Sequence, residues 1–188
     1  MQTRQEPSFF QDADATTLLD IVSEEFADTI GLVMPFSLEE PLLLDSVSPS
    51  LPGGEDEVRV AFKLGFRTSM GTRAGFIQVP LAHALILSGG LQTLPADEIR
   101  ALSARKAPTG EDKAAIHECG KILGCAINSR FKAFLSPDLE VIFAGCQGLG
   151  PGSAPSLPGY GGESFTVRWQ QAGFPGFDSF ELLIAIPL

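Results

Sequence analysis

Two pairs of charged side chains with the same spacing are the residues best placed to do chemistry in this sequence. Glu118 and Lys121 lie three residues apart, and Glu25 and Asp28 repeat that spacing earlier in the chain. Residues three apart on a helix share a face, so each pair can act as a unit. Residue types alone favour a solvated helix surface for Glu118 and Lys121, with an ion pair that contributes roughly a few tenths of a kcal/mol.

Histidine and cysteine side chains give no local metal or nucleophile pattern. His83 and His117 are the only histidines and lie far apart in the sequence, so we predict no metal site and no cofactor. Cys119, Cys125 and Cys146 show no metal or redox spacing, which is typical of reduced thiols in the cytoplasm. Cys119 is expected to be buried, and Cys125, nearer the exposed face, is expected to be the more reactive thiol.

Composition excludes several classes of protein. The chain has 188 residues, of which 44% are hydrophobic, enough for one globular domain. Thirteen basic and 23 acidic residues give a net charge of -10, the wrong sign for binding nucleic acid or an anionic membrane. No apolar run reaches the roughly 18 to 20 residues of a membrane span, and the N-terminal residues lack the pattern of a secretion signal. We therefore expect a cytoplasmic protein.

Two long amphipathic helices are predicted to carry the charged pairs. Apolar residues recur at three- and four-residue steps over 13–33 and over 109–134. Thr109 is a suitable N-cap, and acidic residues follow it in the first helical turn. The apolar stripe of the second helix comprises Ile116, Cys119, Leu123, Ile127, Phe131 and Phe134.

Three strands are predicted to follow each long helix. A helical crossover over 81–108 separates the two sets, and Gly89 and Gly90 are expected to end its first helix. The last strand is almost continuously apolar, which favours a central place in a sheet, with a subunit interface as the alternative. The predicted strands are 36–47, 57–66 and 73–79, then 139–146, 164–171 and 177–186.

This order predicts an α+β fold with an internal repeat. A loosely ordered terminus over 1–11 precedes one domain over 12–188. The domain would consist of two pseudosymmetric halves, about 12–80 and 109–188, each a helix plus three strands. Glu25, Asp28 and Gly31 of the first helix have the same spacing as Glu118, Lys121 and Gly124 of the second.

A stretch of the second long helix resembles a known family. Residues 117–128, HECGKILGCAIN, are similar to the signature helix of the CheC, CheX and FliY chemotaxis phosphatases, which carries Glu-x-x-Asn before a Gly- and Ala-containing continuation. Residues 84–99 look like the crossover of the same family, and the similarity spans about 55–187. The resemblance implies an α+β fold of two pseudosymmetric halves that share an antiparallel β-sheet, with two long helices.

The resemblance also implies a partner and a reaction. In that family the helix docks on a phosphorylated CheY-like receiver domain, where the Glu pairs with a lysine and the Asn orients water toward the aspartyl phosphate. Glu118 matches the Glu, but Lys121 occupies the place of the Asn, and Ala114 the place of an acid or Ser. An ammonium donates hydrogen bonds and accepts none. Glu25 and Asp28 form the pseudo-equivalent pair, where a carboxylate would repel phosphate.

We therefore expect a chemotaxis or two-component signalling protein that binds a CheY-like receiver and whose phosphatase site is altered or lost. Glu118 and Lys121 are the expected catalytic positions, and Glu25, Asp28, Glu118 and Cys125 the expected partner-binding residues. Two alternatives stay open at this point. One is a non-catalytic scaffold or flagellar-switch-like component, and the other is a homodimeric small-molecule sensor with a pocket between the halves.

Overall fold

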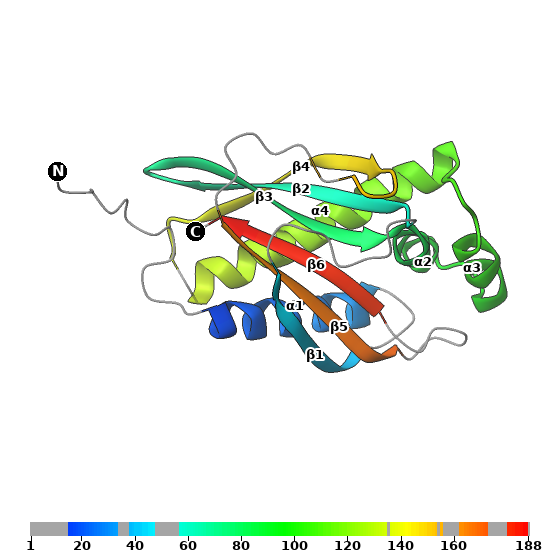
Figure 1. Ribbon diagram of the computed structural model, residues 1–188, viewed down its shortest axis with the longest axis horizontal. Helices are drawn as coiled ribbons and strands as arrows, with labels where there is room; N and C mark the ends of the chain where they lie inside the picture. The colour runs from blue at the N-terminus through cyan, green and yellow to red at the C-terminus, as the bar shows by residue number, and fades with distance from the viewer. Residues whose placement is uncertain are drawn as a thin grey trace.

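The two long helices each precede three strands in the computed structural model, which describes residues 15–33, 38–47, 57–134, 136–153, 155, 162–172 and 180–187. The terminus over 1–11 lies outside the described residues. Between the two sets lie α2 (Leu81–Leu91) and α3 (Ala96–Ser103) (Figure 1). The first set is α1 (Ala15–Val33), β1 (Leu38–Val47), β2 (Arg59–Thr68) and β3 (Gly71–Pro80), and the second is α4 (Gly110–Phe134), β4 (Glu140–Leu149), β5 (Gly162–Ala172) and β6 (Phe180–Pro187).

The strands form one sheet in the order β1-β5-β6-β3-β2-β4, and all five neighbouring pairs are antiparallel. Reading the order backwards exchanges β1 with β4, β2 with β5 and β3 with β6. The two halves are therefore related by a pseudo-twofold at the contact between β3 and β6. This confirms the α+β fold of two pseudosymmetric halves that share an antiparallel sheet. It also confirms the central place of the last strand, in which Leu182 to Ile186 are all buried.

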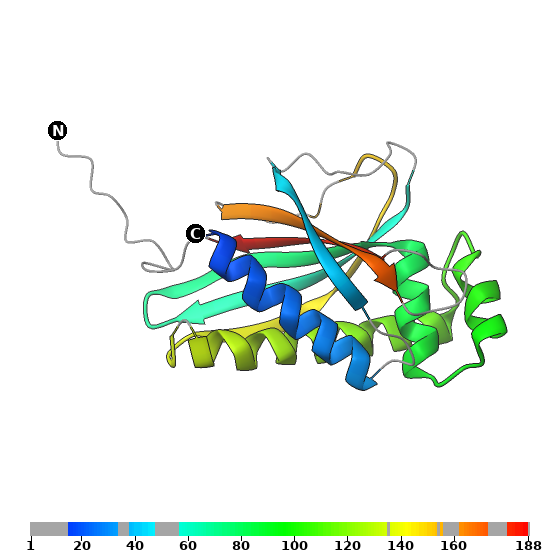
Figure 2. The ribbon, with the colours of Figure 1, turned by 90° about the horizontal axis from the view of Figure 1, so that it is seen from below.

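Both long helices pack on the same face of the sheet (Figure 2). Alternate residues of β2 point toward them, because successive side chains of a strand face opposite sides. Phe62, Leu64 and Phe66 are at most 2% exposed and join Phe26 of α1 and Phe131 of α4 in the main core. Helices α2 and α3 lie together at one end of the sheet (Figure 1).

The predicted end of α2 was wrong. The helix continues through Gly89 and Gly90 to Leu91, and both glycines are buried. A Cβ on Gly89 would lie 2.9 Å from Ile99 and 3.2 Å from Leu102, both on α3. The missing side chain therefore lets α2 and α3 approach closely, and this need outweighs the low helix propensity of glycine.

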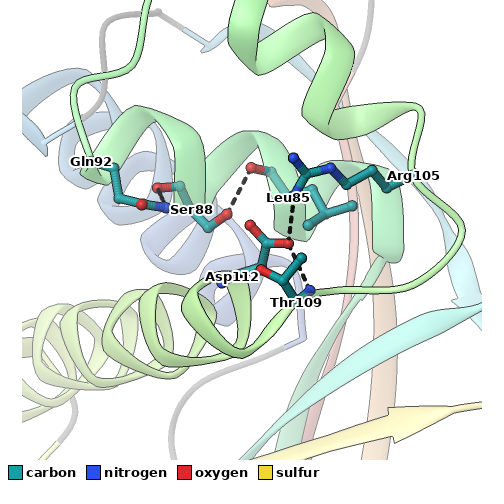
Figure 3. Close-up of polar contacts among 6 residues, drawn as sticks. All are labelled: Leu85, Ser88, Gln92, Arg105, Thr109 and Asp112. Carbon is teal, nitrogen blue, oxygen red and sulfur yellow. Dashed lines mark hydrogen bonds and ion pairs between the residues drawn. The ribbon is translucent and has the colours of Figure 1, made fainter.

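A reciprocal capping arrangement fixes the start of α4 (Figure 3). The backbone N–H of Asp112 donates to Thr109 Oγ1 at 3.3 Å, and the backbone N–H of Thr109 donates to Asp112 Oδ2 at 2.7 Å. This confirms Thr109 as the N-cap. Arg105 Nη1 also lies 2.9 Å from Asp112 Oδ2. Burial by itself would raise the pKa of the Asp112 carboxyl, but the Thr109 hydrogen bonds and the Arg105 charge outweigh it, so the pKa is lowered.

The Asp112 cap predicts a pH-dependent contribution to stability. A carboxyl with a lowered folded-state pKa stabilises the fold at pH values above its unfolded pKa, and this contribution is lost as the pH falls toward the folded pKa. Asp112→Asn should therefore reduce the free energy of unfolding by about 1 kcal/mol at neutral pH. Urea unfolding of both proteins should show this difference shrinking below about pH 4. A difference that does not change with pH would contradict the assignment.

Candidate functional site

The outer face of α4 carries the predicted catalytic pair. Glu118 and Lys121 are both exposed, with 52% and 48% of their side chains accessible, and Lys121 Nζ lies 2.8 Å from Glu118 Oε2. Cys125 is also exposed. It follows Glu118 by seven residues, which places the two almost in line along the helix. The structure thus brings Glu118, Lys121 and Cys125 onto one solvent-facing stripe.

The opposite face of α4 has small residues where it meets the sheet. Gly120 and Gly124 are buried, and a Cβ on Gly120 would lie 2.6 Å from Phe143 of β4 and 2.7 Å from Phe62 of β2. Cys119, on the same side, is 1% exposed. These residues let the helix backbone lie close to the sheet, which directs Glu118 and Lys121 away from it.

The burial of Cys119 separates it chemically from the exposed stripe. Desolvation raises the pKa of its thiol to about 12, so it stays protonated and unreactive at neutral pH. This agrees with the expectation that Cys119 is buried and that Cys125 is the more accessible thiol of the helix.

The second predicted pair, Glu25 and Asp28, lies against a cation from the other half. Arg130 of α4 places its Nε 2.6 Å from Glu25 Oε2, and its Nη2 lies 3.8 Å from Asp28 Oδ2 and 3.9 Å from Glu24 Oε2. Glu25 is the more enclosed carboxylate, with 19% of its side chain accessible against 69% for Asp28. Thr29 also donates its hydroxyl to Glu25 at 3.4 Å. Arg130 therefore offsets part of the negative charge on this surface of α1 and ties α1 to α4.

The two predicted pairs do not form one cluster. Glu118 precedes Arg130 by 12 residues on α4, which corresponds to about 18 Å along a helix axis. Glu25 and Asp28 meet α4 at Arg130, whereas Glu118 has Lys121 as its ion-pair partner. The two pairs of equal spacing thus differ in environment: Glu118 is paired with Lys121 of its own helix, whereas Glu25 and Asp28 lie beside an arginine of the other long helix.

Arg130 is a residue that the sequence analysis missed. The sequence signal for this contact is a basic residue near the end of one long helix and three acidic residues on the other. These charges can be recognised as partners only once the two helices are known to touch. Phe134, expected on the buried stripe, is 59% exposed, and the Arg130 guanidinium lies 5.2 Å from its ring centroid. That expectation for Phe134 was wrong because the repeat of apolar residues extends one turn beyond the last buried contact, at Phe131.

The Arg130 contacts predict unequal coupling to the two carboxylates. Replacing Arg130 by methionine should lower the free energy of unfolding by about 1 kcal/mol, since Arg130 and Glu25 are only partly exposed. A double-mutant cycle in urea should give a larger interaction energy between Arg130→Met and Glu25→Gln than between Arg130→Met and Asp28→Asn. Equal coupling energies would show that the shorter contact and deeper burial of Glu25 do not matter.

No cluster of three or more His, Cys, Asp or Glu side chains with the geometry to hold a metal ion occurs among the residues that the structure describes. None of the helices in this part of the chain is long and apolar enough to span a bilayer.

Comparison with known proteins gives a match by structure and none by sequence. No protein-family model matches the chain, and no curated protein matches it. Thermotoga maritima FliY is similar in structure with a TM-score of 0.61 and 8% identity, over 90% of this chain and 86% of FliY. A CheC-like superfamily protein from Shewanella sp. PV-4 has a TM-score of 0.55 and 9% identity, over 92% and 98%. The FliM middle domain from Vibrio alginolyticus has a TM-score of 0.53 and 11% identity, over 90% and 93%.

These similarities cover 90 to 92% of this chain. The fold is therefore the CheC-like fold that the sequence resemblance implied, at sequence identities of 8 to 11%.

Proposed function

We propose that this chain, which has the CheC-like fold, is a chemotaxis-type signalling protein that binds the phosphorylated receiver domain of a CheY-like response regulator through the outer face of α4. Glu118 is the main contact. Two features of α4 together support this function. The motif of residues 117–128 resembles the receiver-binding helix of the family, and in the structure this motif places Glu118 on the exposed side of α4.

The ion pair between Glu118 and Lys121 does not oppose this role. To bind a lysine of the receiver, Glu118 exchanges one ammonium group for another. An exposed i, i+3 pair contributes at most about 1 kcal/mol, so its loss costs little compared with a new contact at a protein interface. Lys121, once released, can approach the anionic phosphoryl group.

Lys121 decides whether docking leads to hydrolysis. In-line attack on an aspartyl phosphate needs a water held by a group that both donates and accepts hydrogen bonds. The ammonium of Lys121 can attract the phosphoryl group but cannot accept a hydrogen bond from the water. We therefore propose that this chain is a docking protein with little phosphatase activity of its own.

The test measures binding to phosphorylated receiver domains from the same cell by calorimetry. Glu118→Arg should weaken binding by about tenfold or more, because it replaces an attraction to the receiver lysine by a repulsion. Glu98→Arg is the matched control, since Glu98 is an exposed glutamate on α3, and it should bind like the wild type. Equal affinity of the Glu118→Arg variant and the wild type would remove Glu118 from the interface.

A second function is favoured by the combination of Lys121 with the FliM-like fold. The same chain could serve as a non-catalytic assembly component, as in the flagellar switch. This function predicts stable association with a partner that does not depend on receiver phosphorylation. Binding that is equal for phosphorylated and unphosphorylated receivers, or absent for both, would favour it over the first proposal.

A further inference from the structure

His117 lies at the margin of the outer face of α4, on the side where the helix meets β4. Its side chain is exposed, and its ring makes a T-shaped contact with the ring of Phe143 on β4, with 4.9 Å between the centroids and 79° between the planes. Phe143 is half-buried and packs against the main core. Aromatic rings attract each other in this geometry, so the contact restricts the rotamers of the His117 side chain.

The contact depends on the two glycines of α4 that face β4. His117, Gly120 and Gly124 follow one another at steps of three and four residues, so they share one side of the helix. A Cβ on Gly120 would lie 2.6 Å from an outer carbon of the Phe143 ring, and a Cβ on Gly124 would lie 3.3 Å from the Cβ of Phe143. Because both side chains are absent, Phe143 can lie against the helix backbone and reach His117.

His117 is also a neighbour of Lys121. The two residues are four apart, which puts their side chains about 40° apart around the helix axis and one turn apart along it. Glu118 lies on the other side of Lys121 and accepts a hydrogen bond from its ammonium at 2.8 Å. An imidazole, an ammonium and a carboxylate therefore stand side by side on the face that the proposed function assigns to the receiver.

The imidazole has the hydrogen-bonding capacity that Lys121 lacks. A neutral imidazole accepts a hydrogen bond at one ring nitrogen and donates at the other, whereas an ammonium only donates. When Lys121 attracts the phosphoryl group, an imidazole one turn away can accept a hydrogen bond from a water beside that group. Histidine is also the side chain that most often takes a proton in general base catalysis.

We propose that His117 is a catalytic residue of this chain, which holds the attacking water and supplies the small phosphatase activity that the chain has. This role rests on the proposed function, because it needs a phosphorylated receiver bound to α4. The water oxygen forms a bond to phosphorus while the bond between phosphorus and the aspartate oxygen breaks. The aspartate carboxylate leaves with the electron pair of that bond, and the proton of the water passes to His117 and then to solvent.

The decay of a phosphorylated receiver domain from the same cell, with this chain in excess, tests the role of His117. The wild type should shorten the half-life by about two- to fivefold, a small effect because the imidazole reaches the water from the margin of the face. His117→Phe keeps a ring beside Phe143 but cannot accept a hydrogen bond, so the half-life should return to that of the receiver alone. His117→Gln keeps an acceptor and a donor and should retain most of the acceleration. His83→Phe, on α2, is the matched control and should act like the wild type.

Calorimetry with the same phosphorylated receiver separates this role from docking. The His117 variants should bind with the affinity of the wild type, because Glu118 is unchanged. A wild type that does not bind would contradict the proposed function itself. A wild type that binds but leaves the half-life unchanged, or a His117→Phe variant that binds and still shortens it, would overturn the role of His117 and leave docking intact. Equal loss of the acceleration in His117→Gln and His117→Phe would overturn it too, because acceptance of a hydrogen bond would then not be what His117 contributes.

Discussion

Replacing Lys121 by asparagine is expected to shorten the half-life of the aspartyl phosphate on a bound receiver by about tenfold or more. The asparagine amide would supply the acceptor that the lysine ammonium lacks, so it could hold a water in line with the phosphoryl group. Lys121 is exposed and pairs with the exposed Glu118, so the substitution should leave the fold intact. The measurement is the decay of phosphorylated receiver with and without the variant.

The matched control for this prediction is Lys132→Asn, which removes an exposed lysine from the last turn of the same helix. It should leave the receiver half-life as in the wild type. Adding Glu118→Ala to Lys121→Asn should abolish the gain, because docking depends on Glu118. If Lys121→Asn binds the receiver and the half-life does not change, residue 121 does not face the phosphoryl group.

Replacing Gly120 by alanine is expected to lower the free energy of unfolding by about 1 to 3 kcal/mol. The added methyl would lie 2.6 Å from a ring carbon of Phe143 and 2.7 Å from one of Phe62. Both contacts are far shorter than van der Waals distance, and Phe62 is fully buried, so its ring has little room to move. The helix would have to shift away from the sheet, and urea unfolding would record the loss.

Gly31→Ala is the control for this effect. Gly31 lies in the last turn of α1, and no atom apart from the nearby helix backbone lies within 4 Å of the position its Cβ would take. There the gain in helix propensity should appear without a steric penalty and stabilise the protein by up to about 0.5 kcal/mol, less than in a helix interior. Opposite signs for the two substitutions would show that packing, rather than propensity, sets the role of Gly120. A stabilised Gly120→Ala variant would mean that α4 does not lie as close to the sheet as described.

Much of the fold could be predicted because its signals are local. The three- and four-residue repeat of apolar residues located both long helices, and Thr109 followed by acidic residues located the start of α4. Alternation of apolar residues located β2, and a continuous apolar run indicated a central strand, which is β6. Each signal depends on residues within a few positions of one another, where helix and strand geometry fix which side chains share a face.

The candidate site was predictable only in part. The spacing of Glu118 and Lys121 on one helix face, and their ion pair, follow from helical geometry. The equivalent spacing of Glu25 and Asp28 suggested a second site of the same kind. In the structure Arg130 engages these carboxylates, from more than a hundred residues further along the chain. Nothing in the spacing of either helix could indicate this contact.

Local patterns in the sequence thus indicated the elements, their order, the internal repeat and the residues that share the outer face of α4. Tertiary packing was needed to show that α1 and α4 meet at Arg130, that Gly89 lies inside a helix where α2 meets α3, that Phe134 is exposed, and that β1 and β4 form the two edges of the sheet. The physical reason is the range of the interactions. Periodicity and capping act between near neighbours, whereas burial and ion pairing depend on which distant segments the packed core brings together.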